Sequence, residues 1–246
     1  MRQLLPKVED VDPIDVYGAD PRTRPDGRPW VLANMVGSAD GAASLDGRSG
    51  GLAGEADRAV FFAIRGVADV IVAAAGTVRA ERYRPPRPPS AGVADGRRAR
   101  GQAPRPRLAI VTRSMDLDPG AEIFSDPDQP PLVFTGSTAD PGRRAAIEQV
   151  AEVVELGGDG VDLAAMVSWL GAAGASVVLT EGGPNLLGQL IEADLLDELC
   201  LTVAPLLVAG RSERVAHTPG DAVLRALTLE RVLEADGELL LRYVRR

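Results

Sequence analysis

The chain has 246 residues, a net charge of −8, and aromatic residues at 4% of its positions. This balance argues against a nucleic acid as the main partner, because binding a phosphate backbone needs clustered positive charge and base stacking needs exposed rings. One cysteine (Cys200), one histidine (His217) and one lysine (Lys7) exclude a Cys/His zinc site, a disulfide, a triad with a spare histidine and a Schiff-base lysine.

Most of the chain is expected to form one large domain over residues 30–246. Residues 1–29 are rich in Asp, Pro and Arg with little periodicity, so we expect an irregular arm on the surface. The chain opens without the apolar core of a secretory leader and has no run of about 18 apolar residues. We therefore expect a cytoplasmic protein without a membrane partner.

The first strand is expected at residues 30–35, and it opens into a segment rich in glycine and Asp-Gly steps over residues 37–51. Such a strand exit favours a long flexible loop, often a functional one. Asp40 in this segment fits an Asp-Gly turn slightly better than a direct contact with a ligand.

Residues 54–66 have apolar positions at the three- and four-residue spacings of a helix. Asp57 and Phe61 are four residues apart, so they lie on the same face one turn from each other. The local pattern favours an acidic residue at a helix N-terminus, with Phe61 in the core. The alternative is a carboxylate that holds the amidine-like edge of a pterin or pyrimidine while the phenyl ring packs on its plane.

Further strands are expected at 68–75, 108–112, 132–135 and 153–156, and helices at 141–150 and 163–170. This alternation predicts a mainly parallel sheet with helices on both faces. Thr77 follows one strand and suits a phosphate or ribose, while Arg113 and Ser114 follow another, where Arg113 suits a cofactor 2′-phosphate. Repeated Pro and Arg over residues 84–106 indicate a long exposed loop.

The segment 174–191 organises the chain: a buried strand at 177–179, then Gly182, Gly183 and Pro184, then leucines at helical spacing. Glycines let the backbone approach a ligand, and Pro184 suits the first helical position, behind which free amides attract an anion. From the two glycines alone, a tight connection without a ligand is equally good. Glu181 favours a ligand site, because a carboxylate at the end of a central strand points into the binding crevice of open α/β sheets. Its alternative role is to cap the following helix.

The C-terminal part predicts a strand at 195–203 and a hairpin of residues 227–232 and 239–244. Imperfect alternation in this hairpin indicates burial on both sides, by the sheet or by a second subunit. Right-handed crossovers bring the strand ends that carry Gly-Thr, Arg-Ser and Glu-Gly-Gly-Pro to one edge, so a dinucleotide can lie across them. The missing Gly-x-Gly-x-x-Gly argues against an ordinary Rossmann domain.

Five segments together resemble the reductase domain of bacterial riboflavin-biosynthesis deaminase/reductases. They are residues 38–41, 64–72, 76–78, 178–184 and 196–199, and the match runs in order from about Trp30 to Val244. The resemblance implies an α/β fold of the dihydrofolate reductase type and NADPH as the cofactor. It also implies reduction of the ribosyl group of 5-amino-6-(5-phosphoribosylamino)uracil to a ribityl chain, by a homodimer joined through the C-terminal part of the sheet. The His-x-Glu and Pro-Cys-x-x-Cys motifs of the zinc deaminase are missing, so we expect a stand-alone reductase.

Carried over by position, and joined with the strand-end residues above, the resemblance gives two sets of binding residues. The cofactor set is Thr77, Glu81, Arg113, Ser114, Gly182, Gly183, Pro184, Asn185, Leu186 and Leu187, within a turn that runs to Gln189. The substrate set is Ser49, Arg65, Glu181 and an arginine at Arg84 or Arg87, to which the helix pattern above adds Asp57 and Phe61. Hydride comes from the nicotinamide, and the candidate catalytic carboxylates are Asp40, Asp57 and Glu181; we expect no metal.

Two departures from the family leave the substrate open. The Pro/Arg-rich insertion after Tyr83 falls where the family's substrate loop lies. The other departure is the pair Asp57 and Phe61, which is similar to the pair on the helix of dihydrofolate reductases whose acidic residue binds the pterin. A dihydrofolate or other pteridine reductase on the same scaffold is therefore an alternative, and a nucleotide-binding protein without turnover is another.

Overall fold

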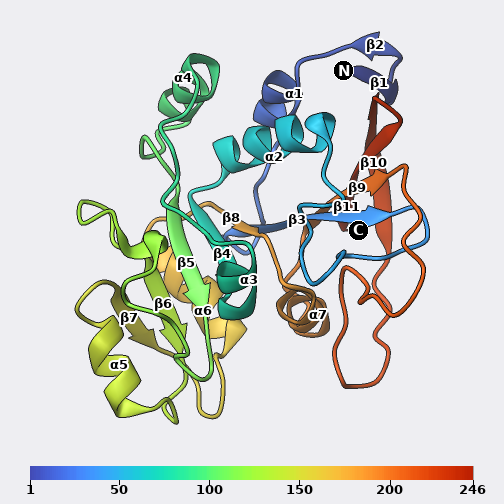
Figure 1. The fold of residues 1–246 in the computed structure, drawn as a ribbon. Helices are drawn as coiled ribbons and strands as arrows, with labels where there is room; N and C mark the ends of the chain where they lie inside the picture. Colours follow the sequence, from blue (N-terminus) through green and yellow to red (C-terminus); the bar gives the residue numbers. More distant parts are fainter. Residues whose placement is uncertain (246) are drawn as a thin grey trace.

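The structure is a computed structural model, and it describes residues 1–245. All strands in this part of the chain belong to a single sheet (Figure 1). Its parallel strands are, in spatial order, β9 (Glu198–Ala204), β3 (Trp30–Ser38), β8 (Val177–Thr180), β4 (Val70–Ala74), β5 (Arg107–Val111), β6 (Leu132–Thr135) and β7 (Glu152–Glu155). On the other side of β9 the sheet continues antiparallel through β11 (Glu238–Arg245), β10 (Leu227–Ala235), β1 (Arg2–Leu5) and β2 (Glu9–Asp10).

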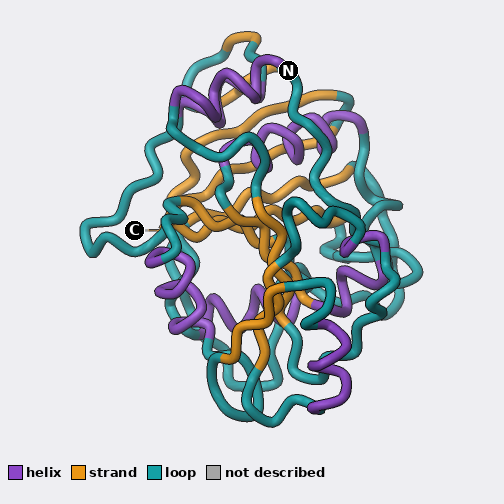
Figure 2. The backbone as a smooth tube through the Cα atoms, turned by 90° about the vertical axis from the view of Figure 1, so that its left-hand side faces the viewer, coloured by secondary structure: helices purple, strands orange, loops and turns teal. Residues whose placement is uncertain are grey.

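Helices cover both faces of this sheet, as Figure 2 shows. One face carries α1 (Pro13–Ala19), α2 (Glu55–Val67), α3 (Ala75–Ala80), α5 (Pro141–Ile147) and a 3-10 turn at Glu122–Phe124. The other face carries α6 (Leu163–Ala172) and α7 (Pro184–Glu192). Side chains alternate along β4, so that Ile71 and Ala73 enter the first core while Val70 and Val72 enter the second. The predicted fold, a mainly parallel α/β sheet with a C-terminal antiparallel hairpin, is confirmed.

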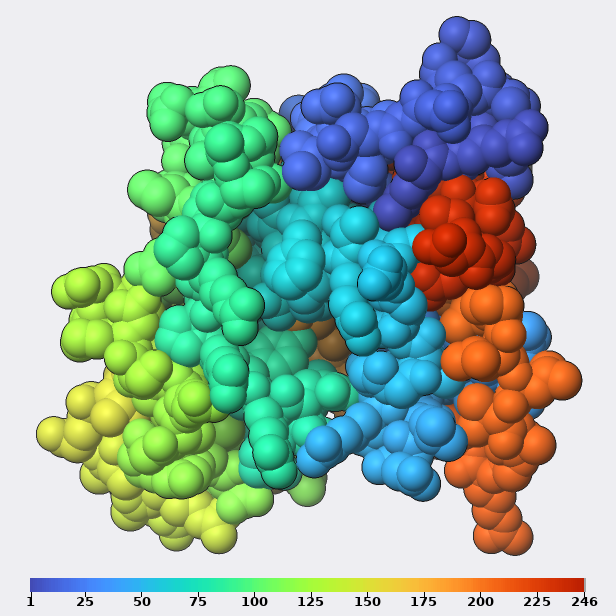
Figure 3. All heavy atoms as spheres, turned by 45° about the horizontal axis from the view of Figure 1, so that its top comes forward, coloured from blue at the N-terminus to red at the C-terminus, as the bar shows by residue number. Residues whose placement is uncertain are grey.

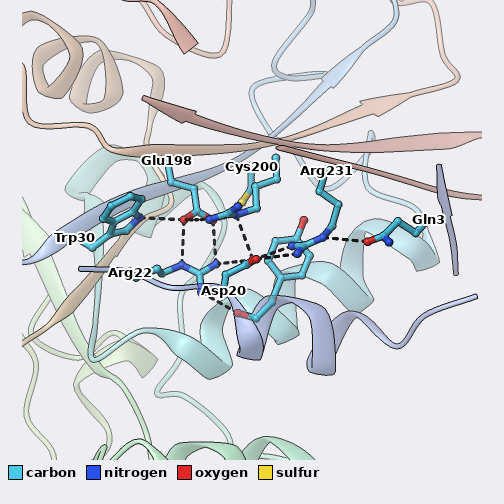
Figure 4. A network of polar contacts seen from close by, with 9 residues as sticks. Gln3, Asp20, Arg22, Trp30, Glu198, Cys200 and Arg231 are labelled. Carbon is cyan, nitrogen blue, oxygen red and sulfur yellow. Dashed lines mark hydrogen bonds and ion pairs between the residues drawn. The ribbon is translucent and has the colours of Figure 1, made fainter. Parts of the chain in front are cut away.

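The N-terminal segment is not the irregular arm predicted for residues 1–29. Strand β1 pairs with β10 and extends the sheet, and Asp12 caps α1 by accepting a hydrogen bond from the amide of Ile14. Behind α1, Arg22 donates two hydrogen bonds to Glu198 of β9 within a buried polar network (Figure 4). The partners of these short elements lie near the other end of the chain. Because the contacts that stabilise them are not local, the sequence of residues 1–29 shows little periodicity.

The predicted exposed loop over residues 84–106 is also wrong in its second half, which forms α4 (Ala91–Ala99). Val93 and Arg97 of this helix are buried. Arg97 donates hydrogen bonds to the carbonyls of Gly66 and Ala68, and Arg100 donates to Gly66, so both cations meet the C-terminal end of α2. The insertion thus stabilises the helix that carries Asp57. No helix in residues 1–245 has the length and apolar character needed to cross a bilayer.

Candidate active site

A cleft of about 1480 Å³ opens at the carboxyl ends of the parallel strands. Its floor is formed by residues at or near the ends of β3, β4, β5 and β8, and its walls by α2, α3, the start of α7 and two loops, residues 43–53 and 208–217. Figure 3 shows a hollow between the light blue segment after β3 and the teal segment around α3. Because open α/β sheets bind ligands at this edge, the cleft is the candidate active site.

The start of α7 forms one wall of the cleft. No side chain caps this helix at Gly183, and Pro184 occupies its first turn, as the sequence predicts. A Cβ atom on Gly183 would lie 2.8 Å from the Thr77 hydroxyl oxygen, so only glycine leaves room beside Thr77. Of the predicted cofactor residues here, Thr77, Gly183, Pro184, Asn185 and Leu186 line the cleft, whereas Gly182 and Leu187 do not. Gly182 supplies the turn with its φ of 81°, and the side chain of Leu187 is buried in the core below.

Other predicted cofactor residues are placed differently. Arg113 lines the cleft and lies 3.7 Å from Asp159, with both side chains exposed. Ser114 lies outside the lining, and its hydroxyl accepts a hydrogen bond from the amide of Asp116. Glu81 accepts hydrogen bonds of 2.7 and 3.0 Å from the amide and hydroxyl of Ser49, a predicted substrate residue. Glu81 thus fastens the loop after β3 to the end of α3.

Glu181 follows β8 directly and is the centre of a polar cluster. The guanidinium of Arg65 donates two hydrogen bonds of 2.7 Å to its two oxygens, and the hydroxyl of Tyr83 donates another. The same guanidinium lies over the ring of Phe61, 4.2 Å from its centroid. Burial opposes the charge of Arg65, but the Glu181 carboxylate raises its pKa above the ordinary value; the pKa of Tyr83 is raised by burial and then by Glu181. Glu181 is therefore held in a fixed orientation, with both of its oxygens hydrogen-bonded.

Asp57, in the first turn of α2, is buried and lines the cleft. Burial raises the pKa of its carboxyl group, Glu238 raises it further, and a hydrogen bond from Thr202 opposes the shift. Glu238 comes from β11 and accepts hydrogen bonds from the amides of Gly54 and Asp57 at 3.0 and 3.1 Å. Phe61 is half-buried and lines the same cleft, so the prediction that the local pattern favoured, a core phenylalanine, is wrong.

Asp40 lies outside the cleft lining, in the turn that the sequence favoured. Its carboxylate accepts hydrogen bonds from the Ser38 hydroxyl and from the amides of Val208 and Ala209. These donors, Ser38 foremost, lower the pKa of Asp40 to about 2. Asp40 thus ties the loop after β3 to the loop after β9.

Neither arginine predicted for the substrate from the Pro/Arg-rich segment lies in the cleft. Arg84 pairs with Glu122 at 2.7 Å, Arg87 is exposed, and neither lines the cleft. Arg58 and Arg211 do line it, and within residues 1–245 neither has a side-chain hydrogen bond or ion pair. Arg58 directly follows Asp57 in the first turns of α2, so its place beside a predicted site residue is the sequence signal that points to it. Arg211 lies in a long loop without periodicity, so no pattern pointed to it.

His217 is also a cleft residue. Its Nε2 atom lies 3.3 Å from a Glu213 oxygen, and both residues line the cleft. The backbone carbonyl of His217 packs so closely on α7 that a Cβ atom on Gly188 would lie 2.3 Å from its oxygen. Contact with α7 therefore holds the loop after β9 against the cleft.

The fold and the cleft define an α/β protein with two kinds of binding surface. One side of the cleft has the glycine turn and the N-terminus of α7, and another has the buried carboxyl group of Asp57 beside the ring of Phe61. In the described part of the chain, no set of three His, Cys, Asp or Glu side chains is grouped to hold a metal ion. The chain belongs to the RibD C-terminal domain family, whose model matches residues 29–241. The family predicted from the sequence is confirmed.

Relatives and solved structures agree with this assignment. The chain is 28% identical over 212 residues to the 2,5-diamino-6-ribosylamino-4(3H)-pyrimidinone 5′-phosphate reductase of Archaeoglobus fulgidus, covering 86% of this chain and 95% of that protein. It superimposes on a pyrimidine reductase-like protein from Corynebacterium diphtheriae with a TM-score of 0.85 and 28% identity, covering 96% and 99% of the two chains. The yeast riboflavin biosynthesis reductase Rib7 shares the fold, with a TM-score of 0.65 and 18% identity over 91% of this chain and 93% of Rib7. The chain is thus an oxidoreductase of the riboflavin-pathway reductase family.

Proposed function

We propose that this chain is an NADPH-dependent reductase that converts the ribosyl group of a phosphoribosylamino-pyrimidine of riboflavin biosynthesis into a ribityl chain. One observation carries the proposal: a single cleft combines the uncapped N-terminus of α7 with the buried Asp57 beside Phe61. A helix N-terminus suits the phosphates of a dinucleotide, and a carboxyl group beside an aromatic ring suits a pyrimidine.

Two pyrimidines fit this description. The sequence resemblance implies 5-amino-6-(5-phosphoribosylamino)uracil. The names of the relatives from Archaeoglobus fulgidus and Methanothermobacter thermautotrophicus give 2,5-diamino-6-ribosylamino-4(3H)-pyrimidinone 5′-phosphate. The two compounds differ at position 2 of the ring, which carries an oxo group in the first and an amino group in the second.

The residues of the cleft fit a phosphorylated dinucleotide. The free amides at the start of α7 and the hydroxyl of Thr77, beside the space that Gly183 leaves, would hold the pyrophosphate. Arg113 is exposed at the cleft and would pair with a 2′-phosphate, which distinguishes NADPH from NADH. When bound, the cofactor supplies the hydride.

The reaction adds a hydride to C1′ of the ribosyl group and a proton to the ring oxygen, while the bond between these two atoms opens. Glu181 lies directly before the glycine turn, and its contacts with Arg65 and Tyr83 fix its orientation, so we assign it to positioning the sugar hydroxyls. Arg58 and Arg211 are the cleft arginines without an ion pair in residues 1–245, and we assign them to the substrate phosphate in place of Arg84 or Arg87.

The decisive experiment follows NADPH oxidation by absorbance with each pyrimidine in turn. We expect turnover with at least one of them, and a lower KM for NADPH than for NADH. The variant Arg113→Ala should raise the KM for NADPH about tenfold and leave that for NADH unchanged, because only NADPH carries the phosphate. Binding of NADPH without oxidation in the presence of either pyrimidine would instead support a nucleotide-binding protein without turnover.

A pteridine reductase is the second candidate, and Asp57 with Phe61 in the cleft favours it. Dihydrofolate carries the same 2-amino-4-oxo edge as the diaminopyrimidinone, so the same carboxylate can bind either. The assay above therefore includes dihydrofolate. Turnover of dihydrofolate that exceeds turnover of both phosphoribosylamino-pyrimidines would replace the leading proposal by this one.

We further propose that the chain forms a homodimer through the outer face of the sheet at strands β9 and β11. On this face Val203 pairs with Leu239, Leu201 with Leu241 and Leu199 with Tyr243. All of these except the exposed Leu239 are half-buried, whereas the residues between them are buried on the inner face. An apolar sheet face of this kind, together with the dimer that the resemblance implies, supports a second copy as its partner.

The variant Leu241→Glu should shift the protein from dimer to monomer, because it places a charge in the centre of this apolar face. Sedimentation velocity measures the change, and a thermal melt checks that the variant is folded. The control Leu224→Glu alters a side chain that is 91% exposed in a loop, and it should leave the oligomeric state unchanged. A monomeric wild-type protein at micromolar concentration contradicts the proposal.

A further inference from the structure

Two of the carboxyl groups that line the cleft are buried, those of Asp57 and Glu181, and they differ in how many hydrogen bonds they already accept. Arg65 and Tyr83 occupy both oxygens of Glu181. Asp57 has a single side-chain partner in the described part of the chain, the hydroxyl of Thr202. Of these two buried carboxyl groups, Asp57 therefore keeps more lone pairs free for the donors of a ligand.

The surroundings of Asp57 suit the edge of a flat ring. Phe61, one turn later on α2, lines the same cleft and offers an aromatic surface. The backbone that carries Asp57 is fixed, because Glu238 accepts hydrogen bonds from the amides of Gly54 and Asp57. A Cβ atom on Gly54 would lie 2.6 Å from Glu238, so glycine is needed for this close approach. The backbone that carries this carboxyl group is thus part of a fixed helix start rather than a mobile loop.

The two candidate pyrimidines present different hydrogen-bonding groups at this edge. In the diaminopyrimidinone the 2-amino group and N3–H are two adjacent donors, which match the two acceptor oxygens of a carboxylate. In the uracil the 2-oxo group replaces the amino group, so an acceptor would face a carboxylate oxygen. A buried site built for a donor rejects a ligand that lacks it, because the polar group of the site is left unpaired.

We propose that Asp57 is the specificity-determining residue of the cleft, and that it selects the 2-amino-4-oxo pyrimidine over its 2-oxo counterpart. This inference rests on the proposed reductase function and goes beyond it by naming which of the two pyrimidines is the preferred substrate. Since both compounds carry the same ribosyl phosphate, the preference arises at the ring edge alone.

Selection of the amino group depends on an ionised Asp57, since a neutral acid presents one donor and one acceptor and so matches the uracil. The groups that face Asp57 are Glu238 from β11, Thr202 from β9 and Arg58 from its own helix. Burial and then Glu238 raise its pKa, whereas Thr202 and Arg58 lower it. The preference for the 2-amino compound should hold above this pKa and diminish as the pH falls through it.

The variant Asp57→Asn tests the inference, because its amide offers one donor and one acceptor in place of two acceptors. Wild-type protein should show a kcat/KM for the 2-amino compound about tenfold to a hundredfold above that for the uracil. Asp57→Asn should reverse this ratio by lowering the first value and raising the second. Calorimetric binding of each pyrimidine to both proteins should show the same reversal in Kd. The control Asp46→Asn changes an exposed acid at the cleft rim and should keep the wild-type ratio.

Two results overturn the inference while leaving the proposed function intact. One is a wild-type protein that reduces the uracil as well as, or better than, the 2-amino compound. The other is an Asp57→Asn variant that still binds NADPH but loses turnover of both pyrimidines in equal proportion. Failure of the wild-type protein to reduce either pyrimidine is a different result, which defeats the proposed function itself.

Discussion

Replacing Glu198 with glutamine is expected to lower the free energy of unfolding by about 3–5 kcal/mol, the usual cost of removing one partner from a buried ion pair. Glu198 is fully buried, and its oxygens accept hydrogen bonds from Arg22, Arg242 and Trp30 at 2.8 to 3.2 Å (Figure 4). A glutamine keeps the shape but removes the charge and turns an amide donor toward guanidinium donors. Arg22 and Arg242 would then keep only Asp20 as a counter-charge, which Asp20 also provides to Arg231.

The same substitution has a defined pH dependence. Burial opposes the charge of Glu198, but Arg22 and Arg242 lower its pKa from the ordinary 4.5 to about 2. A carboxyl group with a lowered pKa in the folded protein stabilises it above the ordinary value, and this contribution is lost as the pH falls toward the folded pKa. The difference in unfolding free energy between wild type and Glu198→Gln should therefore be full at neutral pH and shrink from about pH 5 downward.

Urea denaturation at neutral pH and at about pH 3 measures both effects. The matched control is Glu152→Gln on β7, whose carboxylate also pairs with an arginine at 2.7 Å but has a 48% exposed side chain. Exposed pairs contribute little, so the control should change stability by less than about 1 kcal/mol. An equal effect of the two substitutions would show that the buried network does not hold the N-terminal segment to the sheet.

The second large effect is expected in catalysis, from Glu181→Gln. This change removes the negative charge beside Arg65 and replaces one of the two acceptor oxygens with an NH2 donor. The three hydrogen bonds from Arg65 and Tyr83 can no longer all form, so the polar cluster at the end of β8 loses its fixed geometry. We expect kcat/KM for the preferred pyrimidine to fall about 10²-fold or more, because small misplacements of positioning groups cost that much. The Kd for NADPH should change little, since the amides of α7 and Thr77 are untouched.

Steady-state kinetics and fluorescence titration with NADPH separate these two outcomes. The double variant Arg65→Met/Glu181→Gln should be no worse than the single one, because residues that act as a unit are not additive. Glu122→Gln is the matched control, since Glu122 also pairs with an arginine at 2.7 Å but lies outside the cleft. If Glu181→Gln retained full activity, the assignment of Glu181 to substrate positioning would be wrong.

Local sequence patterns determined the main strands, turns and helices of this protein. The strand at 177–179, the turn that follows and the helix after it were predictable because an apolar run, glycines and Pro184 act within a few residues of one another. The C-terminal hairpin was predictable for the same reason, through the turn at Asp236 and Gly237. Parallel strands share one carboxyl edge, so many predicted site residues do line one cleft: Ser49, Asp57, Phe61, Thr77, Glu81, Arg113, Glu181 and Gly183 to Leu186.

The tertiary structure alone decided how these residues are partnered. The amide of Asp57 binds Glu238, 181 residues away, and Glu198 binds Arg22, 176 residues away. A contact between such distant positions produces no periodic pattern in the sequence. A buried charge is stable only when folding has brought its partner next to it. Thus the sequence by itself determined the strands, the helices and the edge at which they converge. The partners of Glu181, the single hydrogen-bond partner of the Asp57 carboxyl group and the place of Arg58 in the cleft were set only when the chain folded.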